Sequence, residues 1–118
     1  MKADAIIQAL GSLAHEHRLA IFRLLVQAGH EGLAAGQIAE ALKVPNSSLS
    51  FHLAHLHRAG LIGQRRESRS LFYSANYDAM NGLIFFLTEN CCAGSGCAPR
   101  AKAEPDASIA TRKQRKTI

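Results

Sequence analysis

The sequence predicts a mainly α-helical fold with a single β-hairpin. Apolar residues recur at helical spacing before Gly60, whereas two short runs after Gly60 contain strand-forming residues around a charged centre. A last segment returns to a helical pattern. The expected helices are Ala5–Leu13, His17–Ala28, Ala35–Leu42, a helix capped by Asn46 or Ser47 that runs to Ala59, and Tyr77–Asn90; the expected strands are Leu61–Arg66 and Ser70–Ser74.

Glycine and proline residues set the helix boundaries. Gly29 ends the second helix, and Gly60 ends the fourth, because glycine readily adopts the left-handed conformation that follows a helix. Pro45 separates the third helix from the fourth, since proline disfavours helix in the residue before it. Two short helices joined by a tight turn are therefore expected between residues 35 and 59.

The hairpin and the last helix have distinct features. Glu67-Ser68-Arg69 forms a hydrophilic tip without glycine, which predicts a loop longer than a two-residue turn. The last helix contains Leu83-Ile84-Phe85-Phe86-Leu87 and is apolar nearly all round, so we expect it to be buried on more than one side.

This order of elements is that of a winged helix-turn-helix. In that architecture the second helix of the pair enters the DNA major groove, and the hairpin, or wing, reaches the neighbouring backbone or minor groove. Leu49, Leu53 and Leu56 form the buried stripe of the expected recognition helix. Its predicted DNA-contacting residues, together with those of the wing, are Ser47, Ser48, Ser50, His52, Arg65, Arg66 and Arg69. The alternative is that the serines only cap the helix and His52 is solvated.

Basic charge is concentrated in two regions. The 118 residues include 14 Lys and Arg against 9 Asp and Glu, a formal net charge of +5. Residues 37–74 carry +3 and residues 100–118 carry +4, whereas residues 75–99 are net acidic. This balance favours a polyanion partner such as nucleic acid. The final segment has few large apolar residues, which predicts a disordered tail that at most assists DNA binding.

Several short motifs together resemble the ArsR/SmtB family of metal-responsive repressors, over residues 10 to 90. The resemblance lies in His17–Leu25, Gln37–Leu42, Ser50-Phe51-His52-Leu53-Ala54-His55-Leu56 and Ala59-Gly60-Leu61-Ile62. It implies a homodimer paired through the first and last helices. It also implies that the dimer binds palindromic double-stranded operator DNA and releases it when a metal or metalloid binds.

Two sensor sites known in such repressors are absent here. Founding arsenic sensors have a Cys-Val-Cys pair on the helix before the recognition helix, where this chain has Ala39-Glu40-Ala41-Leu42. Zinc sensors use Asp and His pairs on the last helix, and here that helix has Asp78 but no histidine.

All three cysteines instead follow the last helix, as Cys91, Cys92 and Cys97. In a reducing cytosol they should be thiols, which are soft metal ligands. Three sulfurs suit a trivalent thiophile, so As(III) or Sb(III) is the predicted effector, and the arrangement resembles that of arsenic sensors with cysteines at the end of the last helix. The alternatives are a soft or borderline cation such as Cd, Pb, Hg or Zn, thiol redox sensing, or a metal-indifferent protein that binds DNA through its tail.

The sequence thus predicts three parts: a DNA-binding and dimerisation domain at 1–90, a Cys-rich effector segment at 91–97, and a basic tail at 98–118. No catalytic triad, phosphate loop or dinucleotide motif is present, so we do not expect an enzyme. No apolar run is long enough to cross a bilayer, and the N-terminus lacks a signal core. We therefore expect a cytoplasmic protein without a membrane or a protein partner other than its own copy.

Overall fold

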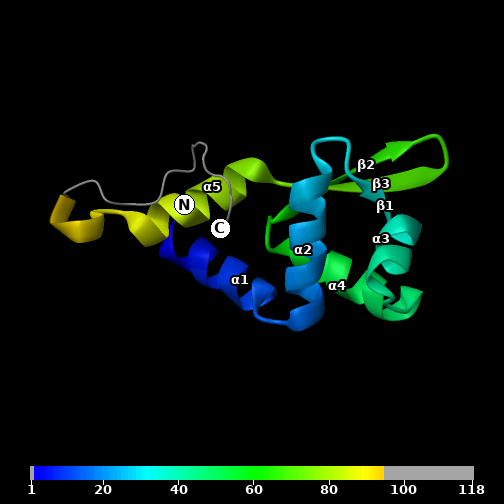
Figure 1. Cartoon of the computed structure of the whole chain (residues 1–118), viewed down its shortest axis with the longest axis horizontal. Helices are drawn as coiled ribbons and strands as arrows, with labels where there is room; N and C mark the ends of the chain where they lie inside the picture. The colour runs from blue at the N-terminus through cyan, green and yellow to red at the C-terminus, as the bar shows by residue number, and fades with distance from the viewer. Residues whose placement is uncertain (1, 95–118) are drawn as a thin grey trace. The chain divides into compact units, whose positions relative to one another are not determined.

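The computed structural model describes residues 2–94 and contains five α-helices and three strands within them (Figure 1). In chain order they are α1 (Ala3–Leu13), α2 (Glu16–Ala28), β1 (Leu33–Ala34), α3 (Ala35–Leu42), α4 (Asn46–Arg58), β2 (Ile62–Glu67), β3 (Ser70–Ala75) and α5 (Tyr77–Thr88), followed by a short turn, η1 (Cys91–Gly94). The chain forms two compact units, which are described separately: one ends at Leu83 and the second begins at Ile84.

The winged helix-turn-helix is confirmed. α3 and α4 form the helix pair, and β2 and β3 form the antiparallel wing, whose tip extends away from the helices (Figure 1). The sheet has the order β1-β3-β2. The two-residue strand β1 was not expected, because Leu33 and Ala34 are too short a run to show alternation; it forms by pairing with Tyr73 and Phe72 of β3.

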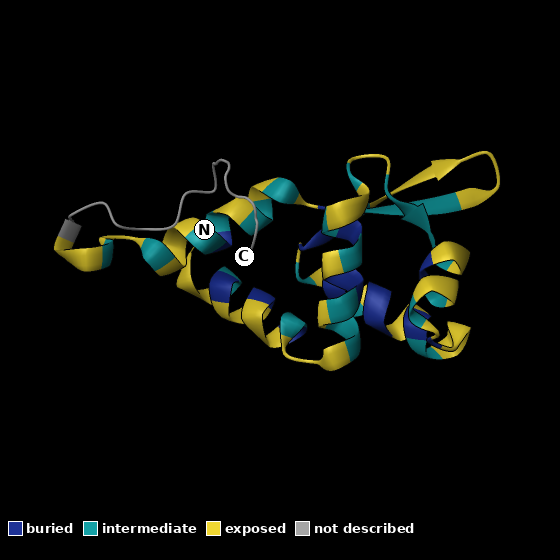
Figure 2. Cartoon of the chain, viewed as in Figure 1, coloured by how far each residue is buried: buried dark blue, intermediate teal, exposed yellow. Residues whose placement is uncertain are grey.

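One apolar core holds the first unit together. Ile21 and Leu25 of α2, Ile38 of α3, and Leu49 and Leu56 of α4 are all fully buried in it. The expected stripe of the recognition helix is confirmed, since Leu53 is also buried. These contacts fix α4 against α2 and α3 and leave Ser50, Phe51 and Ala54 of α4 exposed. Figure 2 shows the buried segments of α2 and α4 side by side and the exposed tip of the wing.

The expectation for the hairpin tip was wrong. Glu67 pairs directly with Ser70, so only Ser68 and Arg69 form the turn, and Ser68 adopts the positive φ of 57° that a glycine usually supplies. In the last helix Leu83 is buried, but Phe85 and Leu87 are 68% and 59% exposed. Burial of this helix on more than one side stays a prediction.

Gly32 occupies a position that no other residue fits well. Its φ is 73°, and a Cβ there would collide with the backbone carbonyl of Tyr73 in β3. We expect Gly32→Ala to lower the free energy of unfolding by about 2–3 kcal/mol. Gly36→Ala is the matched control, because nothing lies within 4 Å of that Cβ and alanine stabilises α3 by up to about 1 kcal/mol. Urea unfolding of both variants measures the difference, and equal stabilities would contradict this explanation.

Candidate nucleic-acid interface

The turn between α3 and α4 leaves the start of α4 open. Lys43 adopts the left-handed conformation and ends α3, and Pro45 precedes the first residue of α4 without a side-chain cap. The capping role expected of Asn46 or Ser47 is therefore not seen, because both residues lie within the helix. The backbone N–H groups of the first turn have no partner within the helix, and together with the helix dipole they favour a phosphate.

The exposed face of α4 carries small polar residues and one aromatic ring. Ser47 and Ser50 are exposed, and Ser48 is half-buried. Phe51 lies four residues after Ser47, is 59% exposed and was not among the predicted DNA-contacting residues. Its i, i+4 spacing from Ser47, off the stripe of buried leucines, is the sequence signal that could have identified it. Hydroxyls hydrogen-bond bases or phosphates, and an exposed phenyl ring can pack on a thymine methyl group.

His52 lies on a different face from these residues. Its side chain is only 6% exposed, and its Nδ1 accepts a hydrogen bond from Nη1 of Arg18 at 3.3 Å. Burial, and then the neighbouring His15, lower the pKa of His52, so that the ring is neutral at pH 7 and can accept this bond. Contact between His52 and DNA stays a prediction, and its burial does not favour it.

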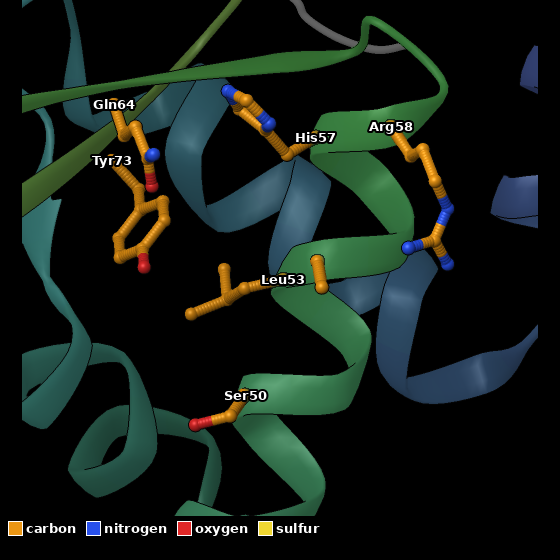
Figure 3. A pocket seen from close by; sticks show the side chains of 7 residues that line it. Ser50, Leu53, His57, Arg58, Gln64 and Tyr73 are labelled. Atoms are coloured by element: carbon orange, nitrogen blue, oxygen red, sulfur yellow. The ribbon is translucent and has the colours of Figure 1, made fainter.

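A cleft separates the recognition helix from the wing (Figure 3). It has a volume of about 280 Å³ and is lined by Ser50, Leu53, Ala54, His57 and Arg58 of α4 and by Gln64 and Tyr73 of the wing. In Figure 3 the wing residues face Leu53 across this space. The cleft is polar and open to solvent, so it is suited to a charged backbone rather than to an apolar ligand.

The three wing arginines differ in what they contact. The Arg65 guanidinium donates to the Glu31 carbonyl at 2.7 Å, forms an ion pair with Glu67 at 3.4 Å and lies over the Phe72 ring at 4.9 Å. The bond to Glu31 holds the wing to the loop before β1, whereas the contacts with Glu67 and Phe72 lie within the wing. Arg66 and Arg69 are exposed, and within residues 2–94 no hydrogen bond or ion pair engages either side chain. They are the wing charges available to a phosphate.

The predicted effector segment is described only in part. Cys91 and Cys92 follow α5 in η1, and their sulfur atoms are 3.4 Å apart. Cys92 is disulfide-bonded in the structure. Cys97 and the basic tail at 98–118 lie outside the described residues.

The described part of the chain has no helix that is both long and apolar enough to span a membrane.

Residues 13–65 match a family model described as a helix-turn-helix domain.

Two curated relatives extend this similarity. The chain is 32% identical to the transcriptional activator HlyU of Vibrio cholerae over 90 residues, 76% of this chain and 80% of the relative. It is 33% identical to the arsenical resistance operon repressor of Bacillus subtilis, over 84% of this chain and 86% of the relative. These relatives are regulators of transcription, which agrees with the prediction that the chain is not an enzyme.

A solved structure has the same fold. It is a homodimeric winged helix-turn-helix DNA-binding domain from Mycobacterium bovis, a possible ArsR-family regulator, with a TM-score of 0.61, 27% identity and coverage of 72% of this chain and 77% of that one. The helix pair, the wing and the relatives together identify a DNA-binding regulator. The chain belongs to the ArsR/SmtB family of winged-helix transcriptional regulators.

Proposed function

We propose that this chain is a cytoplasmic, homodimeric repressor that leaves its operator when As(III) or Sb(III) binds Cys91, Cys92 and Cys97. The observation that carries the proposal is the position of the vicinal pair: Cys91 and Cys92 directly follow α5, with their sulfurs 3.4 Å apart. Once Cys92 is reduced, the pair supplies two soft thiolate ligands to one ion, and Cys97 supplies the third. The similarity to an arsenical resistance operon repressor supports the same effector.

The DNA-binding part of the proposal rests on two adjacent surfaces. Ser47, Ser48 and Ser50 contact the major groove from the open start of α4, and Phe51 packs against base edges beside them. Arg66 and Arg69 contact the backbone from the wing. Arg65 positions the wing through Glu31 and contributes charge.

Dimerisation explains the apolar side chains that a single chain leaves exposed. α5 exposes Phe85, Phe86 and Leu87, and α1 exposes Ile7 and Leu10. Large exposed apolar side chains on two helices indicate a protein interface. The homodimeric neighbour from Mycobacterium bovis supports pairing, and we assign it to the first and last helices.

The effector acts through the end of α5. Three thiolates around one ion would tie the residues that follow α5 to one another, and α5 belongs to the proposed dimer interface. A shift there changes the distance between the two recognition helices, which must remain about one DNA turn apart. A hundredfold loss of operator affinity needs a coupling free energy of only about 2.7 kcal/mol.

Redox sensing is a second candidate, because Cys92 is disulfide-bonded in the structure. In a redox sensor, two cysteine thiols give two electrons and two protons to a peroxide, and a sulfur–sulfur bond forms between them. The O–O bond of the peroxide breaks, and the peroxide is reduced. The disulfide in place of the metalloid then alters the segment after α5.

Fluorescence anisotropy with the duplex from the chain's own promoter separates the candidates. The protein is reduced with a phosphine, freed of reductant and kept anaerobic. We expect one equivalent of As(III) or Sb(III) to release the DNA, and Zn(II) or peroxide to have little effect. Release by peroxide alone, reversed by dithiothreitol, would replace the metalloid function with the redox one. Release by Zn(II) or Cd(II) alone would assign a divalent cation.

A further inference from the structure

Three histidines that are distant in the sequence meet between the start of α2 and the recognition helix. His15 precedes α2, His17 lies in its first turn, and His52 lies in α4. The ring centroids of His15 and His52 are 4.6 Å apart, and His17 is 5.5 Å from each. One nitrogen from each ring can be chosen so that all three lie within 4.8 Å of one another.

This meeting depends on the backbone at His15. The sequence alone argues against a pair, because residues two apart on a helix do not face each other. His15, however, is the N-cap residue and is extended, with φ −156° and ψ 132°. Its ring folds back over the first turn, where Nδ1 accepts a hydrogen bond from the backbone N–H of His17. The two rings therefore converge, and His52 meets them from α4.

The dimensions fit a small divalent cation. Zinc binds imidazole nitrogen at about 2.0–2.1 Å, so three nitrogens of a tetrahedral site are about 3.4 Å apart. The observed nitrogens lie within 4.8 Å of one another, so binding requires the rings to rotate toward the ion. His52 is buried and His17 half-buried, whereas His15 is exposed, which leaves a fourth position for water.

We propose that His15, His17 and His52 form a binding site for a borderline divalent cation, Zn²⁺ or a first-row neighbour, that joins the start of α2 to the recognition helix. Imidazole is a preferred ligand of this class of cation. The site shares no residue with the thiol cluster, so it does not depend on the proposed effector.

Binding of a cation replaces two hydrogen bonds. Arginine can only donate, so Nδ1 of His52 accepts the bond from Arg18 and the ring proton is on Nε2. A neutral His52 therefore has to give up the bond from Arg18 before one of its nitrogens can bind the ion. Arg18 is released from His52 and keeps its bond to the Ser12 carbonyl at 2.6 Å. His15 likewise gives up its bond from His17. Three coordinate bonds take their place and fix α4 to α2.

Cobalt(II) spectroscopy tests the site in the full-length chain. Cys91, Cys92 and Cys97 are all replaced with serine, so that thiolate cannot bind the ion. We expect one Co²⁺ per protomer with tetrahedral visible absorption, displaced by Zn²⁺, and a higher melting temperature with either ion. His17→Gln should weaken binding by about tenfold or more and remove the thermal shift.

His57→Gln is the matched control, because His57 is exposed on α4 outside the cluster. It should bind Co²⁺ like its parent. His17 is only half-buried, so its substitution should leave the melting temperature of the metal-free chain nearly unchanged, which separates loss of a ligand from loss of the fold. No Co²⁺ binding by the cysteine-free chain, or equal affinity in the His17→Gln variant, would overturn the proposal.

Discussion

Operator release by As(III) is expected to disappear when any one of Cys91, Cys92 and Cys97 is replaced with serine. A hydroxyl does not replace a thiolate as a ligand of a soft ion, so each variant loses one of three bonds. Operator affinity without effector should be unchanged, because no cysteine lies on α4 or the wing. Anisotropy titrations should show that As(III) lowers the operator affinity of the parent by about a hundredfold and leaves the operator affinity of the variants unchanged.

Ser95→Ala is the control for this series, since it changes a small polar residue of the same segment without removing sulfur. It should respond like the parent. If all three serine variants still released DNA, the effector site would lie elsewhere. If only Cys97→Ser responded, two thiolates would be sufficient.

Replacing Arg66 and Arg69 together with alanine is expected to weaken operator binding by at least about a hundredfold at low salt, because charge-assisted hydrogen bonds to phosphate are lost. A dimer carries four of these side chains. The slope of log affinity against log salt concentration should therefore become shallower by about 3 to 4. Titrations at several salt concentrations measure both effects.

Arg23→Ala is the matched control, because Arg23 is also exposed but lies on α2, outside the recognition helix and the wing. It should leave the slope unchanged. Because Arg66 and Arg69 are exposed and form no hydrogen bond or ion pair within residues 2–94, the double variant should unfold at the parent's temperature. An unchanged salt slope would show that the wing does not contact the phosphates.

Most of the fold could be predicted because local signals were strong. Ala35–Leu42 has the predicted bounds, and Pro45 and Gly60 delimit α4 within a residue or two. The errors arose where long-range packing decides the structure. β1 forms only because Leu33 pairs with Tyr73 of β3. Ser68 adopts a positive φ because the paired strands β2 and β3 impose a two-residue turn.

The candidate interface was predictable in outline but not in its roles. Helical spacing selected Ser47 and Ser50, but it could not show that Arg65 is engaged by Glu31 and Phe72 while Arg66 is available. Spacing also could not show that His52 packs against His15, because that contact joins segments 37 residues apart through an extended N-cap.

X-ray absorption at the arsenic K-edge tests the central claim most directly. The reduced full-length protein is loaded with one equivalent of As(III) per protomer, and the number of sulfur neighbours is determined. A site made by Cys91, Cys92 and Cys97 predicts three sulfurs and no oxygen around arsenic. Arsenic surrounded by oxygen, or a count of three sulfurs that is unchanged when Cys97 is replaced with serine, would contradict it.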